Sequence, residues 1–265
     1  MGIRETQRVA ERLGMEVIGV PLRKGIQPKE WISPDNGQSV CPEEAVLGYF
    51  RRDGWRGYSG EGGLLLNLIK AMSFDDLPRC FRTAYIESLY TEAVKPPVST
   101  GRNGWLCEAE GYEYEGKRQY SASYFLNNVQ SADLTIIKRN YTTMSSPHFA
   151  ENRNPLLELP PSLEGWMFNE LYEVAGNSVI FQIASKFIED PYEYRRGWPD
   201  ITMWRNGELR FVEVKTPGDK FRDSQIKIVN EFAIPLKLKF VLAVVYPDDT
   251  CSPLRPNTRS LFDDH

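Results

Sequence analysis

The sequence predicts an α/β protein built on a mixed β-sheet with flanking helices. Three features of its C-terminal third lead to this class. Residues 162–188 carry apolar side chains at helical spacing, residues 201–214 form two strand-like segments around Asn206-Gly207, and residues 239–247 are almost entirely apolar. An Asn-Gly pair between such segments is a strong signal for a β-hairpin. A strand that is apolar on both faces is typical of the middle of a covered sheet.

The first part of the chain is predicted to be mostly helical. Residues 4–13 are typical of a short amphipathic helix, and residues 16–22 of a strand. Residues 41–54 predict a second helix, with a proline in its first turn and a glycine beyond its end. A glycine-rich connector at 54–63 then leads to a helix at 64–72, which is apolar nearly all round and is therefore expected to be buried.

The remaining segments are less regular. Residues 93–160 have no clear period and indicate an irregular insertion or a set of short helices. Residues 222–237 predict an amphipathic helix with Asp223 or Ser224 as its N-cap and Pro235 near its end. We therefore divide the chain into a mostly helical N-terminal region with an insertion (1–160), an α/β core (161–250) and a polar tail (251–265).

The composition is that of an ordinary globular protein. Hydrophobic residues make up 41% of the 265 residues, enough for one large domain or two small ones. The formal net charge of −4 argues against a nucleic-acid ligand, since most such proteins are basic. The argument is weak, because a nuclease can combine carboxylates at its metal ions with a local basic groove.

The cysteines and the N-terminus favour an intracellular protein. The four cysteines are widely spread and form no C-x-x-C pair, and the sequence contains only two histidines. We therefore expect free thiols and no zinc site. We see no signal peptide and no apolar stretch of membrane-spanning length. The cysteines are Cys41, Cys80, Cys107 and Cys251, and the histidines are His148 and His265.

Two acidic side chains and a lysine are expected to meet at the predicted hairpin. Asp200 follows Pro199 at the start of the first strand, and Glu213 and Lys215 lie near the end of the second. Because side chains alternate along a strand, Glu213 and Lys215 share one face while Val214 points into the core. The hairpin brings Asp200 beside them. The result is a pocket of two carboxylates, with the Val214 carbonyl as a third oxygen.

Such a pocket suits a hard divalent cation. Mg²⁺ binds one or two carboxylates together with waters and substrate phosphate, and a bound ion activates water and clamps the phosphate. Lys215 would hold the nucleophile or stabilise the charge that builds on the phosphorane. The alternative interpretation is a solvated hairpin with ordinary surface charges, with Glu164 and Glu170 as rival acids on the preceding helix.

Several motifs connect these residues to a known family. The segment RRGWPDITMW (195–204) contains R-x-G-x-P-D, and LRFVEVKTPGDKFRDSQ (209–225) contains E-V-K-x-P-G-D and a downstream glutamine. In these motifs the chain resembles the VRR-NUC branch of the PD-(D/E)XK nuclease superfamily. Upstream, EEAVLGYFRRDGWRGYSGEGGLLLNLIKAM (43–72) and FRTAYIESLY (81–90) are similar to segments of the Fanconi-associated nuclease family.

The resemblance implies a PD-(D/E)XK restriction-endonuclease-like core, with Mg²⁺ or Mn²⁺ as the cofactor. It implies that Glu61, in Ser59-Gly60-Glu61-Gly62, is a further acid ligand of the metal, and that Gln225 supports the site from the following helix. The implied catalytic residues are Glu61, Asp200, Glu213, Lys215 and Gln225, and the implied metal ligands are Glu61, Asp200, Glu213 and Val214. The sequence departs from the family at Ser59, where a histidine is frequent.

Basic and aromatic residues near these acids are candidates for DNA contacts, either with phosphates or by stacking on an unpaired base. The alternatives are charged helix ends for the arginines and core packing for the tryptophans. The arginines are Arg51, Arg52, Arg56, Arg195 and Arg196, and the tryptophans are Trp55, Trp105 and Trp198.

We therefore expect a metal-dependent, structure-specific DNA endo- or exonuclease that acts on flapped or branched DNA in repair or recombination. The alternatives are a Holliday-junction resolvase, like the short dimeric VRR-NUC proteins, a restriction or anti-phage nuclease on the same core, and a DNA-binding subunit with an unused site. The long separation between Glu61 and Asp200 favours the Fanconi-associated arrangement. Members of that family also carry a SAP-type domain and a helical-repeat domain that hold part of the pocket for the 5′ phosphate, so a preference for flaps does not follow from the motifs alone.

Overall fold

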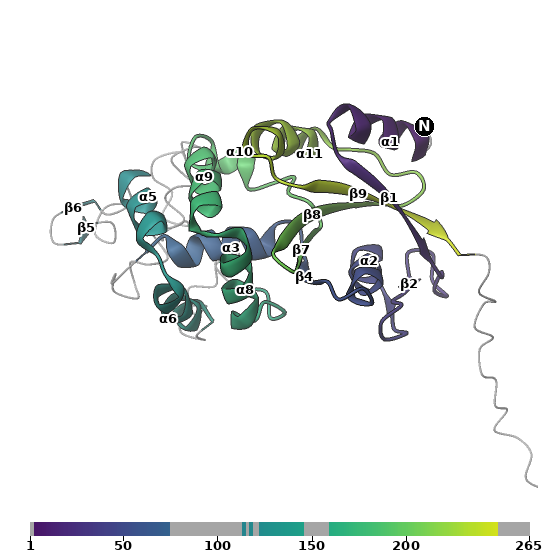
Figure 1. Ribbon diagram of the computed structural model, residues 1–265, viewed down its shortest axis with the longest axis horizontal. Helices are drawn as coiled ribbons and strands as arrows, with labels where there is room; N and C mark the ends of the chain where they lie inside the picture. Colours follow the sequence, from purple (N-terminus) through teal and green to yellow (C-terminus); the bar gives the residue numbers. More distant parts are fainter. Residues whose placement is uncertain (1–2, 75–112, 115–116, 119–121, 146–158, 249–265) are drawn as a thin grey trace, which may run out of the picture.

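A five-stranded mixed sheet organises the protein, in the order β1-β9-β8-β7-β4 (Figure 1). The computed structural model describes residues 3–74, 113–114, 117–118, 122–145 and 159–248. The sheet strands are β1 (Glu16–Leu22), β4 (Arg56–Ser59), β7 (Ile201–Arg205), β8 (Glu208–Lys215) and β9 (Phe240–Pro247). Two short ribbons pair β2 (Trp31–Ile32) with β3 (Ser39–Val40), and β5 (Glu113–Tyr114) with β6 (Lys117–Arg118).

Helices cover both faces of this sheet. In Figure 1, α2 (Pro42–Arg51) lies below it, and α1 (Ile3–Arg12) and α11 (Asp223–Ile228) lie above it. Helix α11 continues through a π-helical turn (Val229–Ala233) into α12 (Ile234–Leu236). The other helices are α3 (Gly63–Met72), α5 (Ala122–Ser131), α6 (Leu134–Met144), α8 (Gly165–Ala175), α9 (Asn177–Phe187) and α10 (Pro191–Tyr194).

The strand directions bring three chain segments to one end of the sheet. Strands β1, β8 and β9 are parallel, β7 runs antiparallel to β8, and β4 runs antiparallel to β7. The ends of β8 and β4 and the start of β7 therefore meet. Ser59 pairs with Ile201, and Ile201 pairs with Val212. The residues just beyond these pairs are the predicted acids.

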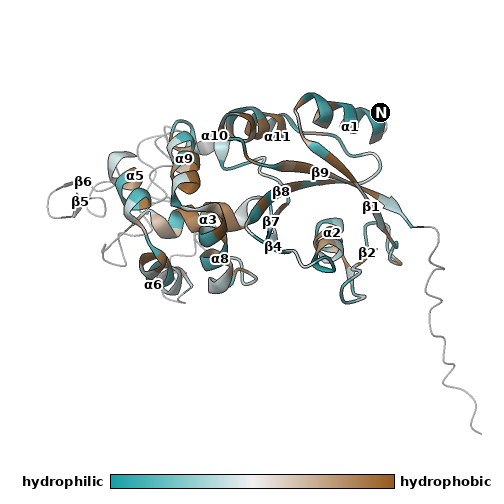
Figure 2. Cartoon of the chain, viewed as in Figure 1, coloured by the Kyte–Doolittle hydropathy of each residue, from teal (hydrophilic) through white to brown (hydrophobic). Residues whose placement is uncertain are grey.

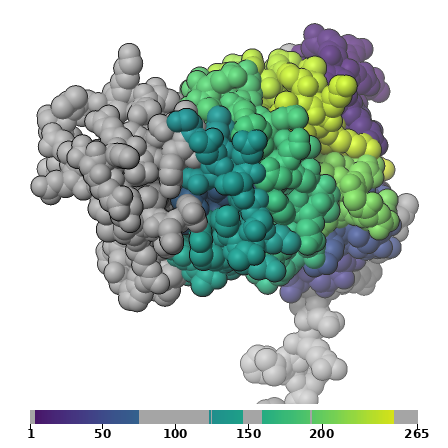
Figure 3. All heavy atoms as spheres, turned by 60° about the vertical axis from the view of Figure 1, so that its left-hand side comes forward, coloured from purple at the N-terminus to yellow at the C-terminus, as the bar shows by residue number. Residues whose placement is uncertain are grey.

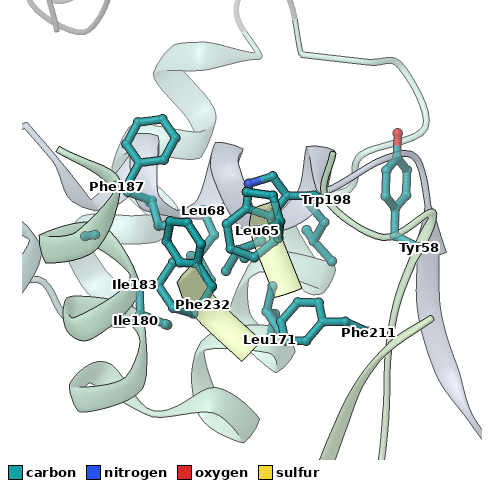
Figure 4. Close-up of a cluster of buried hydrophobic side chains, with 14 of the residues drawn as sticks. Tyr58, Leu65, Leu68, Leu171, Ile180, Ile183, Phe187, Trp198, Phe211 and Phe232 are labelled. Atoms are coloured by element: carbon teal, nitrogen blue, oxygen red, sulfur yellow. The ribbon is translucent and has the colours of Figure 1, made fainter. Parts of the chain in front are cut away.

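Two hydrophobic cores hold the sheet between its layers. The alternation along β8 sends Val212 and Val214 toward α2, and Phe211 toward the larger core on the opposite face. Figure 4 shows this larger core, where Trp198 and Phe232 stand beside side chains of α3 and α9. Trp198 is fully buried, and its indole N–H donates to the Tyr194 carbonyl at 2.7 Å, so the ring packs without an unsatisfied donor.

Helix α3 is the centre of the helical side of the molecule. Figure 2 shows it as one of the most hydrophobic helices, whereas α1 exposes a hydrophilic face. In Figure 3 the teal helices α5 and α6 lie directly against the green helices α8 and α9. These contacts join part of the insertion to the larger core. Among the described helices, none combines the length and apolar character needed to cross a bilayer.

Most expected elements are confirmed, including both N-terminal helices, the hairpin and the buried strand. Asn206 and Gly207 have φ values of 50° and 80°, as a tight hairpin turn requires. The described helices α5 and α6 agree with a set of short helices in the insertion. The mixed sheet with flanking helices is the α/β architecture that the sequence predicted.

Two local expectations need correction. The glycine-rich connector contains β4, which is a strand because β7 supplies its hydrogen-bonding partner. The N-cap residue of α11 is Arg222, one position before the nearer of the two expected caps. Asn177 opens α9, and its side-chain amide donates to the carbonyls of Val129 and Ala132.

The division at residue 160 stays a prediction about domains, and the sheet draws strands from both sides of it. Strands β1 and β4 precede this position, and β7, β8 and β9 follow it. The polar tail (251–265) lies outside the described residues, which end at residue 248.

Candidate active site

Asp200, Glu213 and Lys215 converge at the end of the sheet where β7 begins and β8 ends. Lys215 Nζ lies 2.7 Å from Glu213 Oε1, as expected for strand residues two positions apart. Asp200 Oδ2 accepts a hydrogen bond from the Val214 N–H at 2.7 Å. That bond continues the β7–β8 ladder one step beyond the last strand pair, so Asp200 is held by the backbone that carries Glu213 and Lys215.

Gln225, from α11, joins the two charged side chains of β8. Its Nε2 donates to Glu213 Oε1 at 2.5 Å, and its Oε1 accepts from Lys215 Nζ at 3.2 Å. The same Oε1 accepts the backbone N–H of Arg222 at 2.9 Å. An amide suits this position because it offers a donor to the carboxylate and an acceptor to the ammonium. All three of Glu213, Lys215 and Gln225 are buried.

The two carboxyl groups share a site that disfavours negative charge. Burial, together with the charge of Asp200, raises the pKa of Glu213 to about 8 in spite of the adjacent Lys215 ammonium. Burial also raises the pKa of Asp200 to about 6, against the opposing effect of the Val214 N–H. A divalent cation between the two groups would supply the missing positive charge.

The donor atoms fit such a cation. Glu213 Oε2 is buried without a hydrogen-bond partner, which is costly unless a ligand satisfies it. Val214 directs its N–H to Asp200, and because the N–H and C=O of a strand residue point to the same side, its carbonyl opens toward the same space. A carboxylate oxygen from each acid and this carbonyl are hard oxygen ligands of the kind that Mg²⁺ and Mn²⁺ prefer.

Glu61 approaches the acids on a strained turn that is tied to Asp200. The Gly60 N–H donates to the Asp200 carbonyl at 2.7 Å, and Glu61 has a φ of 30°, in a region that glycine tolerates better than any other residue. Its negative charge contributes to the raised pKa values of Asp200 and Glu213. Strain of this kind in a non-glycine residue is frequent at functional sites.

In this conformation the Glu61 carboxylate is paired with Arg222 and contacts neither Asp200 nor Glu213 by any hydrogen bond of the described residues. Glu61 Oε1 accepts a hydrogen bond from Arg222 Nη1 at 3.2 Å, and both side chains are more than half exposed. Within the described ranges no three Asp, Glu, His or Cys side chains are close enough to hold an ion together. The structure thus brings together Asp200, Glu213, Lys215 and Gln225, and leaves Glu61 at the rim.

Comparison with known proteins identifies the segment that carries this geometry. The VRR-NUC domain family matches residues 148–235, which include Asp200, Glu213, Lys215 and Gln225. Over this segment the chain is similar to VRR-NUC domains. The acidic residues lie at the β7–β8 hairpin of the mixed sheet.

One solved structure supports the same fold over most of the chain. A crystal structure of paFAN1 bound to DNA with a gap and a 2-nucleotide 5′ flap superposes with a TM-score of 0.54 and 16% sequence identity, covering 91% of this chain and 41% of that one. A second paFAN1 structure, bound to DNA with a 1-nucleotide flap and a gap, has a TM-score of 0.45 and 16% identity, covering 92% and 42%. The chain therefore spans about two fifths of the length of paFAN1 in these structures. None of the curated proteins matches the sequence.

The matched segment and the elements before it fit together closely at the site. A Cβ atom on Gly62 would lie 2.5 Å from the Trp198 side chain, so the Glu61 turn packs directly on the segment before Asp200. A Cβ atom on Gly197 would lie 2.4 Å from the Ser224 backbone, which brings that segment equally close to α11. Both glycines have a positive φ. The sequence R-x-G-x-P-D thus needs its glycine for a close approach of two backbones.

Four of the predicted arginines lie at the end of α2 or between α10 and Asp200. Arg51 pairs with Asp35 and Glu44, Arg52 is exposed after α2, and Arg196 pairs with Glu193. Arg195 is partly buried in the turn before Asp200. These arginines stay candidates for phosphate contacts.

Arg56 and the two rival acids, Glu164 and Glu170, contact other side chains of the fold. Arg56 stacks on Trp166 and pairs with Glu170 at 2.6 Å, and Glu170 also accepts from the Trp204 indole. Glu164 accepts from the Trp166 indole. The rival acids are therefore engaged away from Asp200.

The two predicted tryptophans that the structure describes are also engaged in the fold. Trp198 is a core residue, and Trp55 is buried with the guanidinium groups of Arg205 and Arg210 over its ring, so neither is available for stacking on a base. Trp105 lies outside the described residues, as do both histidines and every cysteine except the free, exposed Cys41.

Three residues at the site were not predicted. Glu43, in the first turn of α2, adds negative charge near Asp200 and contributes to its raised pKa. Thr6, from α1, donates to the Asp219 carbonyl at 2.9 Å and so fastens the loop after Lys215. Arg222 contacts Glu61. Only Glu43 carried a local signal, as an acidic residue in a first helical turn; the other two depend on contacts between distant segments.

Proposed function

We propose that this protein is a Mg²⁺- or Mn²⁺-dependent DNA nuclease that hydrolyses phosphodiester bonds at flapped or branched DNA. The observation that carries the proposal is the buried Glu213 carboxylate, which has one oxygen committed to Lys215 and Gln225 and the other without a partner beside Asp200. The VRR-NUC match at these residues supports nuclease chemistry.

The chain's own residues divide the work of such a reaction. Asp200, Glu213 and the Val214 carbonyl would hold the metal ion, and Glu61 would join them by turning inward. When bound, the ion supplies a water of lowered pKa and a charge that clamps the phosphate. Lys215 is held beside Glu213 with its ammonium group directed by Gln225, where it can orient the water or donate to a phosphorane oxygen.

The reaction is a displacement at phosphorus. The water oxygen forms a new P–O bond, the P–O bond to the leaving nucleoside breaks, and the leaving oxygen takes a proton. The burial of Glu213 and Lys215 keeps their side chains in one geometry, which lowers the cost of organising the site as charge develops.

The substrate class is proposed from the shared fold. paFAN1 is bound to 5′-flap DNA in a structure whose fold matches 91% of this chain. Because the chain spans 41% of that protein, we propose for it the ability to cut near a junction of single and double strands, and a role in DNA repair or recombination.

The test is a cleavage assay on labelled DNA. The purified protein is given a 5′ flap, a 3′ flap, a splayed arm, a four-way junction and a plain duplex, each with Mg²⁺, Mn²⁺ or EDTA. We expect metal-dependent cleavage that is fastest on a flap or splayed arm and is lost in Asp200→Ala. Cleavage that survives in Asp200→Ala, or that needs no metal, contradicts the proposed site.

The same assay separates the alternatives. Symmetric cuts in the four-way junction by a dimer would indicate a resolvase, and cuts at a fixed sequence in plain duplex would indicate a restriction-type nuclease. Tight DNA binding without cleavage under any metal would indicate a DNA-binding subunit.

A further inference from the structure

Arg222 is fixed by its backbone to the centre of the active site. Its N–H donates to Gln225 Oε1 at 2.9 Å, and Gln225 in turn contacts both Glu213 and Lys215. The loop before it is closed by Asp219, whose carboxylate accepts from the N–H and the hydroxyl of Thr216 at 2.8 and 2.7 Å. The position of the Arg222 backbone is therefore set by the same network that orients the catalytic groups.

The Arg222 side chain is free to move in a way that its backbone is not. It is 68% exposed, and it contacts Glu61, which is 54% exposed. An ion pair between two such exposed side chains is weak, since water solvates both partners well when they separate. The contact can therefore be exchanged for another without a large cost.

The two partners of this pair have different alternative ligands. A cation held by Asp200 and Glu213 would attract the Glu61 carboxylate, which already contributes to their electrostatic environment. A guanidinium group released from Glu61 would stand at the rim with its forked donors facing solvent, and this geometry matches two oxygens of a phosphate. The carboxylate of Glu61 thus occupies the place that a phosphate oxygen would take.

We propose that Arg222 binds a backbone phosphate of the DNA substrate next to the metal site, and that Glu61 holds this arginine until the metal ion binds. The proposal rests on the proposed nuclease function. It makes metal binding and DNA binding mutually favourable, because the metal ion removes Glu61 from Arg222 and so uncovers the phosphate site. By linkage, DNA bound to Arg222 frees Glu61 for the metal to the same extent.

The test uses Arg222→Gln and two readouts that should move in opposite directions. Without DNA, Arg222→Gln should bind Mn²⁺ about two- to fivefold more tightly than wild type, because Glu61 no longer has to leave an ion pair; free Mn²⁺ is measured by electron paramagnetic resonance. With Mg²⁺ present, the variant should bind 5′-flap DNA about three- to tenfold more weakly. The slope of log Kd against log salt concentration should fall by about 1, the change expected for the loss of one phosphate contact.

DNA binding is measured by fluorescence anisotropy on a Lys215→Met background, so that the DNA stays intact. In EDTA the loss on Arg222→Gln should be smaller than in Mg²⁺, because Glu61 still covers the arginine of the reference protein. Arg222→Lys should recover part of the binding, since it restores the charge without the fork. The Mn²⁺ titration needs no second substitution and stands by itself if Lys215→Met does not fold.

Lys239→Gln is the matched control. Lys239 is also exposed and paired with a carboxylate, Glu208 at 2.6 Å, but it lies at the opposite end of the sheet. It should change neither readout. Weaker Mn²⁺ binding in Arg222→Gln, or unchanged DNA binding in Mg²⁺ while wild type cleaves DNA, would overturn the proposal for Arg222 alone. Failure of wild type to bind Mn²⁺ and to cleave would overturn the nuclease proposal itself.

Discussion

The two acidic regions of the site are built in opposite ways. Glu213 lies on a central strand, is buried, and has fixed partners in Lys215 and Gln225. Glu61 lies on a strained, exposed turn and is paired with an exposed arginine. The difference teaches that the proposed metal site would combine a preorganised half, which costs little to assemble at each turnover, with an adjustable half that responds to the ligand.

The largest effect should come from breaking the preorganised half. Lys215→Met and Asp200→Asn are each expected to reduce the cleavage rate by about 10³-fold, because each removes a group that acts on the developing charge or the metal ion. Single-turnover cleavage of 5′-flap DNA measures the loss, with circular dichroism as the control for folding. A variant that keeps more than a tenth of the wild-type rate would remove that residue from the machinery.

Gln225→Leu should have the next largest effect. It leaves the carboxylate of Glu213, the ammonium of Lys215 and the N–H of Arg222 without their shared partner. Groups that orient metal ligands are worth about 10- to 100-fold in activity or metal affinity, and we expect a loss of about 1–3 kcal/mol in the free energy of unfolding. Urea titration and Mn²⁺ binding test both values. Unchanged metal affinity would mean that Gln225 serves the fold only.

The raised pKa values predict an unusual pH dependence for the metal-free protein. An unfolded chain releases the Asp and Glu protons near pH 4, whereas the folded protein keeps them up to a pKa of about 6 at Asp200 and about 8 at Glu213. Stability from these groups is thus complete at acidic pH and is lost as pH rises toward 8. We expect the Tm to fall by about 5 °C between pH 5 and pH 8.

Mg²⁺ should remove most of this fall, because the cation binds the deprotonated carboxylates of the folded state. Glu213→Gln should also flatten the profile, since its amide does not titrate. Scanning calorimetry with EDTA or Mg²⁺ compares the three cases. A wild-type profile that is equally steep in Mg²⁺ and in EDTA would argue against metal binding at these acids.

The smallest effect concerns the adjustable half. Glu61→Gly should raise the free energy of unfolding by about 0.5–1 kcal/mol, because glycine adopts a positive φ without strain, while cleavage falls. Glu61→Ala should lose cleavage equally without the gain in stability. Asn206→Gly, at another non-glycine position with a positive φ, is the control, because asparagine already tolerates this region and the turn is remote from the acids. Equal stability of the two Glu61 variants would show that the turn is not strained.

The preorganised half could be predicted from local patterns in the sequence, whereas Glu61 was named only through the family resemblance and its pairing with Arg222 was not predicted. Strand alternation and the Asn206-Gly207 turn place Glu213 and Lys215 on one face beside Asp200, because all of these relations are local in the chain. The pair formed by Glu61 and Arg222 joins segments that meet only through the sheet and α11. Strand β4 was missed for a related reason, since Arg-Gly-Tyr-Ser has little strand character until β7 pairs with it.

The position of β9 has a consequence for how the protein is made. Strand β9 lies between β1 and β8, and Glu16 of β1 pairs with Val241 of β9. Strand β1 therefore finds its neighbour only after the distant strand β9 has been synthesised. Late closure of this kind slows folding and prolongs the exposure of apolar strand surface. Premature termination before residue 240 should accordingly yield aggregated chains rather than a smaller folded protein.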